Sequence, residues 1–237
     1  MKKNQHLTED SLAASYILPI PDQIFHFLST NSDNFVSAPS TDHQRAAFRI
    51  LRYLKNAPGS GVFFNNNFLQ LKAFSDSDWA TCQETKKSIT GFSVYLGNSL
   101  ISWKSKKQQT ISRSSSEAKY RALATTACEI QWITYLLEDL HISYTKPTLL
   151  YCDNCSTIQI ASNQVFHERT KHIETDFHVV REKLNTGLLK LLPVSSSMQG
   201  ADIFTKHLPL TLFRDIHFKL GMKNIYSQLE RGVNVLY

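Results

Sequence analysis

The chain has 237 residues, of which 42% are hydrophobic and 19% charged, an ordinary globular composition that excludes wholesale disorder. Its net charge of +6 is compatible with a polyanionic partner but does not require one. The four cysteines are too few for a disulfide scaffold, and no stretch approaches the roughly 18 uncharged apolar residues of a membrane span, so neither is expected.

The first predicted helix covers about residues 40–57, and residues before it show no sustained periodicity. Ser40 or Thr41 can cap this helix, and Pro58 ends it. Alternating apolar residues then predict strands at about 68–76, 88–97 and 99–107, with a hairpin turn between the last two. Strands joined by hairpins are antiparallel neighbours.

The second half of the chain alternates between helices and strands. We expect a long helix at 114–140, a strand at 147–154, helices at 156–163 and 170–187, and a strand at 188–194. A short helix at 199–208 and a helical segment ending at Gly221 follow. Strands connected through helices are usually parallel, so the sequence predicts one mixed sheet with helices packed on it, preceded by a small helical region.

Four acidic residues stand at predicted strand ends or helix starts: Asp76, Glu117, Asp153 and Asp202. Asp76 and Asp153 end two strands that we expect to be parallel neighbours, and such strand ends are where α/β sheets build sites. Converging carboxylates repel one another unless a cation lies between them. Oxygen ligands suit Mg²⁺ or Mn²⁺, and two such ions can promote hydrolysis of a phosphodiester. The four acids are therefore the predicted catalytic residues and metal ligands.

Several motifs occur in one order that resembles the ribonuclease H domain of the Pol polyprotein of copia-type LTR retrotransposons, particularly those of plants. They are "FSDSDWATC", "KKSITGFSVYLGNSLISWKSKKQQTISRSSSEAKYRALA", "YCDNCSTIQIASN", "VFHERTKHIETDFHVVREKL" and "GADIFTKHLP". The stretch "HQRAAFRILRYLKNAPGSGVFF" resembles the segment that links reverse transcriptase to this domain. The resemblance covers about residues 40–221.

This resemblance implies an α/β fold with a ribonuclease H-like mixed five-stranded sheet flanked by helices. It implies a connection remnant at 1–66, the ribonuclease H-like domain at 67–209 and a tail at 210–237, in a truncated copy without the polymerase core. The implied activity is hydrolysis of RNA in an RNA–DNA hybrid with two Mg²⁺ or Mn²⁺ ions during reverse transcription. Implied partners are the hybrid and the polymerase portion of Pol, in the cytoplasm or nucleus, with no membrane association.

The helix acid departs from the family pattern, which has Ser-x-x-Glu-Ala-Glu-Tyr where this chain has Ser-Ser-Ser-Glu-Ala-Lys-Tyr. If the first glutamate is the ligand, it is retained as Glu117; if the second is, it has become Lys119. Other ribonuclease H domains favour the second register, and positions two apart on a helix point about 200° apart, so Glu117 cannot easily substitute. The alternative to an active nuclease is thus a catalytically silent hybrid-binding relic of a decayed element.

Basic residues provide candidate nucleic-acid contacts: Lys104, Lys106 and Lys107 on a strand, and Arg169 and Lys171 before a helix. Cys152 and Cys155, followed by His167 and His172, have zinc-finger spacing. No zinc is expected, because Cys152 falls in an apolar strand and the finger's usual aromatic and leucine residues are missing.

Overall fold

The computed structural model describes residues 69–82, 85–163 and 173–206, with scattered residues between 41 and 64 and between 208 and 224. Most of the predicted connection remnant therefore lies outside the described residues. Those described within the predicted first helix, from Thr41 to Lys55, are helical. The predicted domain limits at 66 and 209 remain a prediction.

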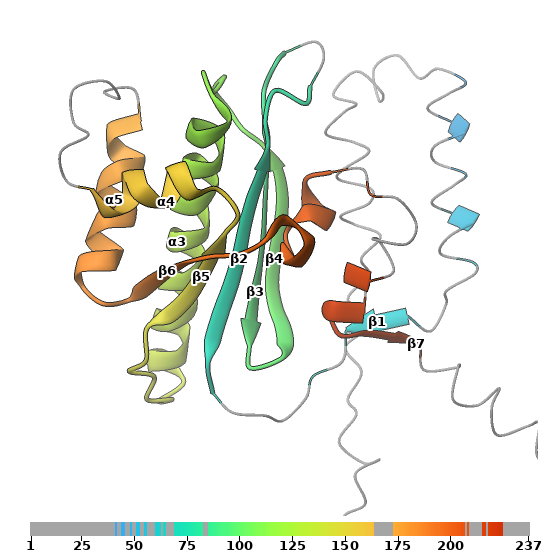
Figure 1. Cartoon of the computed structure of the whole chain (residues 1–237). Coiled ribbons are helices and arrows are strands. Elements are labelled where there is room, and N and C mark those ends of the chain that lie inside the picture. The colour runs from blue at the N-terminus through green and yellow to red at the C-terminus, as the bar shows by residue number, and fades with distance from the viewer. Residues whose placement is uncertain are drawn as a thin grey trace, which may run out of the picture.

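The centre of the molecule is a five-stranded sheet (Figure 1). Its strands are β2 (Leu71–Asp78), β3 (Ile89–Leu96), β4 (Ser99–Lys107), β5 (Thr148–Cys152) and β6 (Leu189–Pro193), in the order β4-β3-β2-β5-β6. The hairpin strands β2, β3 and β4 are antiparallel, whereas β5 and β6 run parallel to β2. The predicted mixed sheet of the ribonuclease H-like fold is confirmed, because hairpin and helical connections impose these directions.

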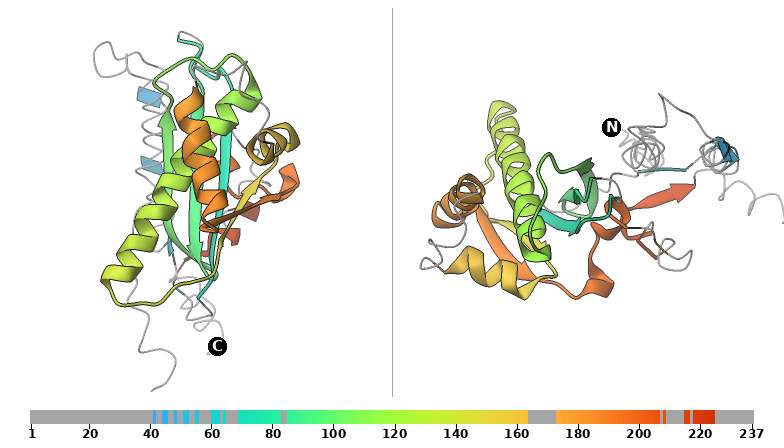
Figure 2. Two further views of the ribbon diagram at one scale, coloured as in Figure 1. Left: turned by 90° about the vertical axis from the view of Figure 1, so that its left-hand side faces the viewer. Right: turned by 90° about the horizontal axis from the view of Figure 1, so that it is seen from above.

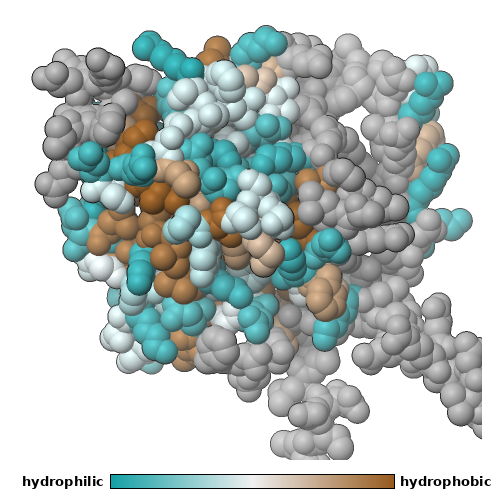
Figure 3. All heavy atoms as spheres, viewed as in Figure 1, coloured by the Kyte–Doolittle hydropathy of each residue, from teal (hydrophilic) through white to brown (hydrophobic). Residues whose placement is uncertain are grey.

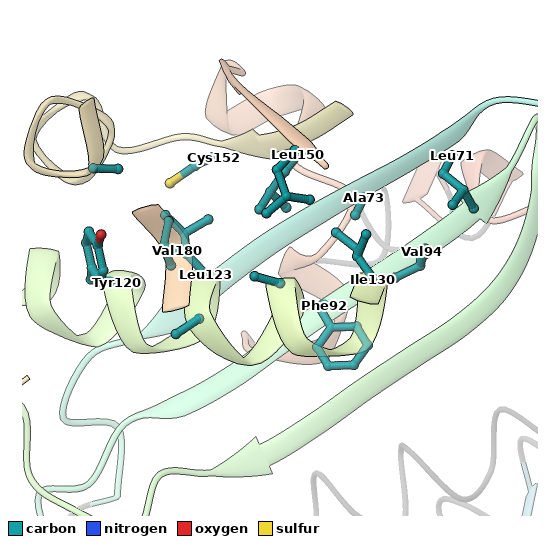
Figure 4. Close-up of a cluster of buried hydrophobic side chains, with 14 of the residues drawn as sticks. Leu71, Ala73, Phe92, Val94, Tyr120, Leu123, Ile130, Leu150, Cys152 and Val180 are labelled. Carbon is teal, nitrogen blue, oxygen red and sulfur yellow. The ribbon is translucent and has the colours of Figure 1, made fainter. Parts of the chain in front are cut away.

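Three helices cover one face of this sheet: α3 (Ser115–Asp139), α4 (Cys155–Ser162) and α5 (Glu174–Asn185) (Figures 1 and 2). On α3, Ile130 lies next to the sheet residues Ala73 and Val94, and Leu123 lies beside Val180 of α5 (Figure 4). Fully burying one such side chain is worth about 1.5–3 kcal/mol. This core fixes the rotation of α3 about its own axis, and hence which of its polar side chains face the strand ends.

Shorter elements occupy the opposite face of the sheet. They include two 3₁₀ turns, η3 (Ser196–Met198) and η4 (Asp202–Phe204), so the helix predicted at 199–208 is a single short turn. A second small sheet pairs β1 (Ser60–Val62) with β7 (Met222–Asn224) (Figure 1). Strands of three residues are too short to show a period, and the sequence analysis missed them.

The space-filling view shows apolar residues over α4, β5 and β6, surrounded by hydrophilic ones (Figure 3). The partly buried Ile158, Ile160 and Leu191 pack there against the main core. Among the described residues, no helix has the length and apolarity needed to cross a membrane.

Candidate active site

Three of the four predicted acids meet at one edge of the sheet. Asp76 lies on β2, and Asp153 follows the end of β5, the parallel neighbour of β2. Asp202 begins η4, which packs on the same face of the sheet as the Asp76 side chain. All three carboxylates are largely buried, and Asp76 is fully so. Buried carboxylates need partners, and lysines provide them here.

Lys119 joins the first two aspartates. It lies in the second turn of α3, and its Nζ is 2.8 Å from Asp76 Oδ1 and also donates a hydrogen bond to Asp153. Lys119 is only 12% exposed, so its ammonium group has little contact with water. The helix position that faces the strand ends is therefore 119, and it carries a cation.

Lys206 joins the third aspartate to the first. Its Nζ lies 2.8 Å from Asp202 Oδ1 and 3.1 Å from Asp76 Oδ2. Thr205 Oγ1 also donates a hydrogen bond to Asp76 Oδ2, at 2.6 Å. Asp76 Oδ2 therefore has a hydrogen bond and an ion pair, whereas the buried Oδ1 has the ion pair with Lys119 but accepts no hydrogen bond.

The pKa values follow from burial and from these charges. Burial acts to raise the pKa of Asp76, but the charges of Lys119 and Lys206 outweigh it and lower the pKa to about 2. Burial raises the pKa of Asp202 to about 6, aided by the negative charge of Asp76 and opposed by Lys206. Burial tends to lower the pKa of Lys119, but Asp76 and Asp153 raise it overall, so this lysine is charged at neutral pH.

Gly91 allows η4 to approach the sheet beside Asp76. It is the residue of β3 paired with Asp76. A Cβ at this position would lie 2.5 Å from Thr205 Cγ2 and 2.8 Å from Phe204 Cβ, distances that require a shift. The absence of a side chain at 91 therefore lets Thr205 reach the carboxylate.

The structure does not bring Glu117 to the aspartates. Its backbone N–H donates to Ser114 Oγ, and its Oε2 accepts from the backbone N–H of Arg113, which caps the start of α3. Its Oε1 accepts from Arg121 at 3.1 Å. Glu117 therefore does not belong to the acid cluster. The helix turns position 119, and not position 117, toward the strand ends.

The arrangement of these side chains does not fit a pair of divalent ions. Oxygen ligands of the kind that Mg²⁺ prefers are present on three aspartates, but two ammonium groups lie between them. Among the residues that the structure describes, no three acidic, histidine or cysteine side chains are gathered so as to hold a metal. The charge that metal ions would supply comes from lysines here.

The other predicted site residues are only partly described. Lys104 and Lys106 are exposed on β4, and Lys107 is half-buried at its end. Arg169 and Lys171 lie outside the described residues, as do His167 and His172. Cys152 is buried in β5, and burial raises the pKa of its thiol to about 11.

Sequence reasoning missed Thr205 and Lys206 as site residues. Their only signal was their place in "GADIFTKHLP", three and four residues after Asp202. On a helical turn such residues lie close to Asp202, which indicates that a lysine there can pair with it. Thr205 and Lys206 are 129 and 130 residues from Asp76 in the chain, so no local pattern could predict that they contact it.

The chain is similar in sequence to Pol polyproteins of plant transposons. No family model matches the chain. It is 43% identical over 192 residues to the retrovirus-related Pol polyprotein from transposon RE1 of Arabidopsis thaliana, covering 81% of this chain and 13% of that polyprotein. It is 34% identical over 212 residues to the one from transposon TNT 1-94 of Nicotiana tabacum, covering 90% of this chain and 16% of that polyprotein.

Among solved structures, LC11-RNase H1 in complex with an RNA/DNA hybrid is similar to this chain. The TM-score is 0.44 at 10% identity, over 57% of this chain and 94% of that one. Our assignment of the fold depends on the strand order and directions described above.

Proposed function

We propose that this chain acts as a ribonuclease H domain in a catalytically silent form. It belongs to the retrovirus-related Pol polyproteins from transposons, and it spans about 13% of the length of such a polyprotein. In this proposal the domain binds RNA–DNA hybrids, and Lys119 keeps it from cutting them. The reverse transcriptase portion of such polyproteins is the proposed partner that makes the hybrid.

One observation carries the proposal: Lys119 Nζ is paired with both Asp76 and Asp153. The pair is largely buried, and removing one partner of a buried ion pair leaves an uncompensated charge that costs about 3–5 kcal/mol. A divalent cation that bound these aspartates would have to displace the Lys119 ammonium group, and this largely buried group would then be the charge left without a partner. Since the pKa of Lys119 is raised, deprotonation at neutral pH does not remove the obstacle.

The retained aspartates support the ribonuclease H ancestry of the site. Asp76, Asp153 and Asp202 remain together around the lysines, so replacing Lys119 by glutamate should give a cluster of four carboxylates in which Lys206 is the one remaining cation. We therefore expect Lys119→Glu to gain Mg²⁺-dependent cleavage of the RNA strand of a labelled hybrid. Wild type should show no cleavage above the protein-free rate.

A matched control makes the same charge change elsewhere. Lys190 is exposed on β6, so Lys190→Glu should stay silent. Adding Asp76→Asn to Lys119→Glu should abolish the restored cleavage. The proposal is wrong if wild type cleaves the hybrid and loses that activity with Asp76→Asn, or if Lys119→Glu folds and binds hybrid but stays silent.

A further inference from the structure

A polar groove of about 290 Å³ lies between the edge strand β4 and the helices α3 and α5. Asp76, Asp153 and Asp202 do not line this groove. Its lining consists of Thr90, Lys104, Lys106, Lys107, Gln108, Gln109, Thr110, Arg121, Thr125 and Asp176. No aromatic or aliphatic residue is among them, so the groove has no ring of its own on which a base could stack.

The groove is strongly positive. Its lining carries four cations, on Lys104, Lys106, Lys107 and Arg121, and one carboxylate, on Asp176. The Glu117 carboxylate pairs with Arg121 beside the lining, so the local balance is +2. Lys104 and Lys106 are two residues apart on β4, so both side chains project from the same face of the strand. This concentration of charge in one hollow points to an anionic ligand.

Arg121 is held in position at the groove wall. Its Nε and Nη2 both donate to Glu117 Oε1, at 3.3 and 3.1 Å, and its Nη1 lies 3.7 Å from Asp176 Oδ2. A guanidinium that two carboxylates already hold in place loses less conformational freedom when it binds an anion. These contacts also give Glu117 a role away from the aspartates.

Lysines on an edge strand often serve only to prevent pairing with another sheet. That explanation covers Lys104 and Lys106, but not the anchored Arg121. Nor does it cover the hydroxyl of Thr110 and the amide of Gln109 that line the same hollow. Cations combined with neutral donors are what phosphate oxygens of a nucleic-acid backbone accept from.

We propose that this groove binds the phosphodiester backbone of the RNA–DNA hybrid through Lys104, Lys106 and Arg121. The inference rests on the proposed function for the identity of its ligand. It does not depend on Lys119, because the groove lies apart from the paired aspartates. Recognition here is independent of base sequence, because contacts with the phosphates carry no sequence information.

The test measures binding of the full chain to a fluorescent RNA–DNA hybrid in EDTA over a range of salt concentrations. Lys104→Gln/Lys106→Gln should weaken binding about tenfold and reduce the slope of log K against log salt by about two, one for each lost phosphate contact. The control Lys146→Gln/Lys190→Gln removes the same charge from two exposed lysines outside the groove, and should change the slope by much less.

Hydrogen exchange locates the contact. In wild type, the hybrid should protect backbone amides at 104–110 and 121–125, and the groove variant should lose this protection. Equal weakening by both double variants, or by neither, overturns the groove while leaving hybrid binding in place. The same titration is repeated with single-stranded RNA of the same sequence. If the groove variant loses affinity for the single strand but not for the hybrid, the hybrid is not the ligand of the groove. Absence of any hybrid binding by wild type overturns the proposed function as well.

Discussion

Three carboxylates meet two ammonium groups beside β2, so the charges do not balance when all of them are ionised. Asp76 has two lysine partners and keeps its charge, with its pKa lowered to about 2. Asp202 shares one lysine with Asp76, and burial raises its pKa to about 6. Asp202 is therefore the side chain that takes up a proton first as the pH falls.

This raised pKa predicts how stability depends on pH. The folded protein binds the Asp202 proton more tightly than the unfolded chain does, so stability rises as the pH falls from about 7 to about 4. We expect a contribution on the order of 2 kcal/mol, which Asp202→Asn removes. Below about pH 4 the lowered pKa of Asp76 acts in the opposite direction, and its stabilising contribution is lost toward pH 2.

Urea unfolding of wild type and Asp202→Asn at a series of pH values measures this effect. Asp215 is exposed, so Asp215→Asn serves as the control and should keep the wild-type profile. A rise between pH 7 and 4 that persists in Asp202→Asn would show that another group causes it.

Helix α3 presents different chemistry on different sides because its core residues fix its rotation. Lys119 faces the aspartates, whereas Glu117 and Arg121, one turn apart, pair with each other beside the basic groove. The turn η4 depends in a similar way on a close approach to β3 at Gly91. In both elements, the direction of the polar side chains is therefore set by how neighbouring residues of the same element pack against the sheet.

Gly91→Ala should displace η4 from β3. The added Cβ would lie within 2.8 Å of two η4-region side-chain atoms, an overpacking that typically costs about 1–3 kcal/mol. Gly200→Ala is the control, because its nearest neighbour atoms lie at 3.4 Å, an ordinary contact. Chemical denaturation compares the two, and equal stability of both variants would show that η4 does not need the glycine.

The flanking segments are part of the same folded body. Val62 of β1 and Met222 of β7 belong to a second apolar cluster with Tyr95 and Leu100 of the main sheet. Leu220, which precedes β7, is also buried in this cluster. We infer that the small sheet stabilises the face of the main sheet opposite α3, the face on which η4 packs.

Leu220→Ala should therefore destabilise the whole protein. Truncating a leucine that is 1% exposed typically costs about 2–5 kcal/mol. Phe218→Ala, two residues away, should have almost no effect because Phe218 is 77% exposed. Thermal unfolding followed by circular dichroism checks both, and an unchanged melting temperature for Leu220→Ala would mean that the second cluster is not coupled to the main fold.

Local patterns in the chain sufficed for the main architecture. Alternating apolar residues, hairpin turns and helix caps predicted all five strands of the main sheet and helices α3 to α5 in order. The same patterns placed Asp153 and Asp202 at ends of elements that meet, whereas β2 continues two residues beyond Asp76, to Asp78. Such signals are local, because strands and helices repeat over two and 3.6 residues.

Contacts between distant residues required the folded structure. The sequence left two registers open for the helix acid, and the packing of α3 on the sheet turned Lys119, not Glu117, toward Asp76 and Asp153. The β1–β7 pair and the contact of Lys206 with Asp76 likewise join residues more than a hundred positions apart. No short-range pattern encodes these, since they arise only when the packed core sets the rotation of each element.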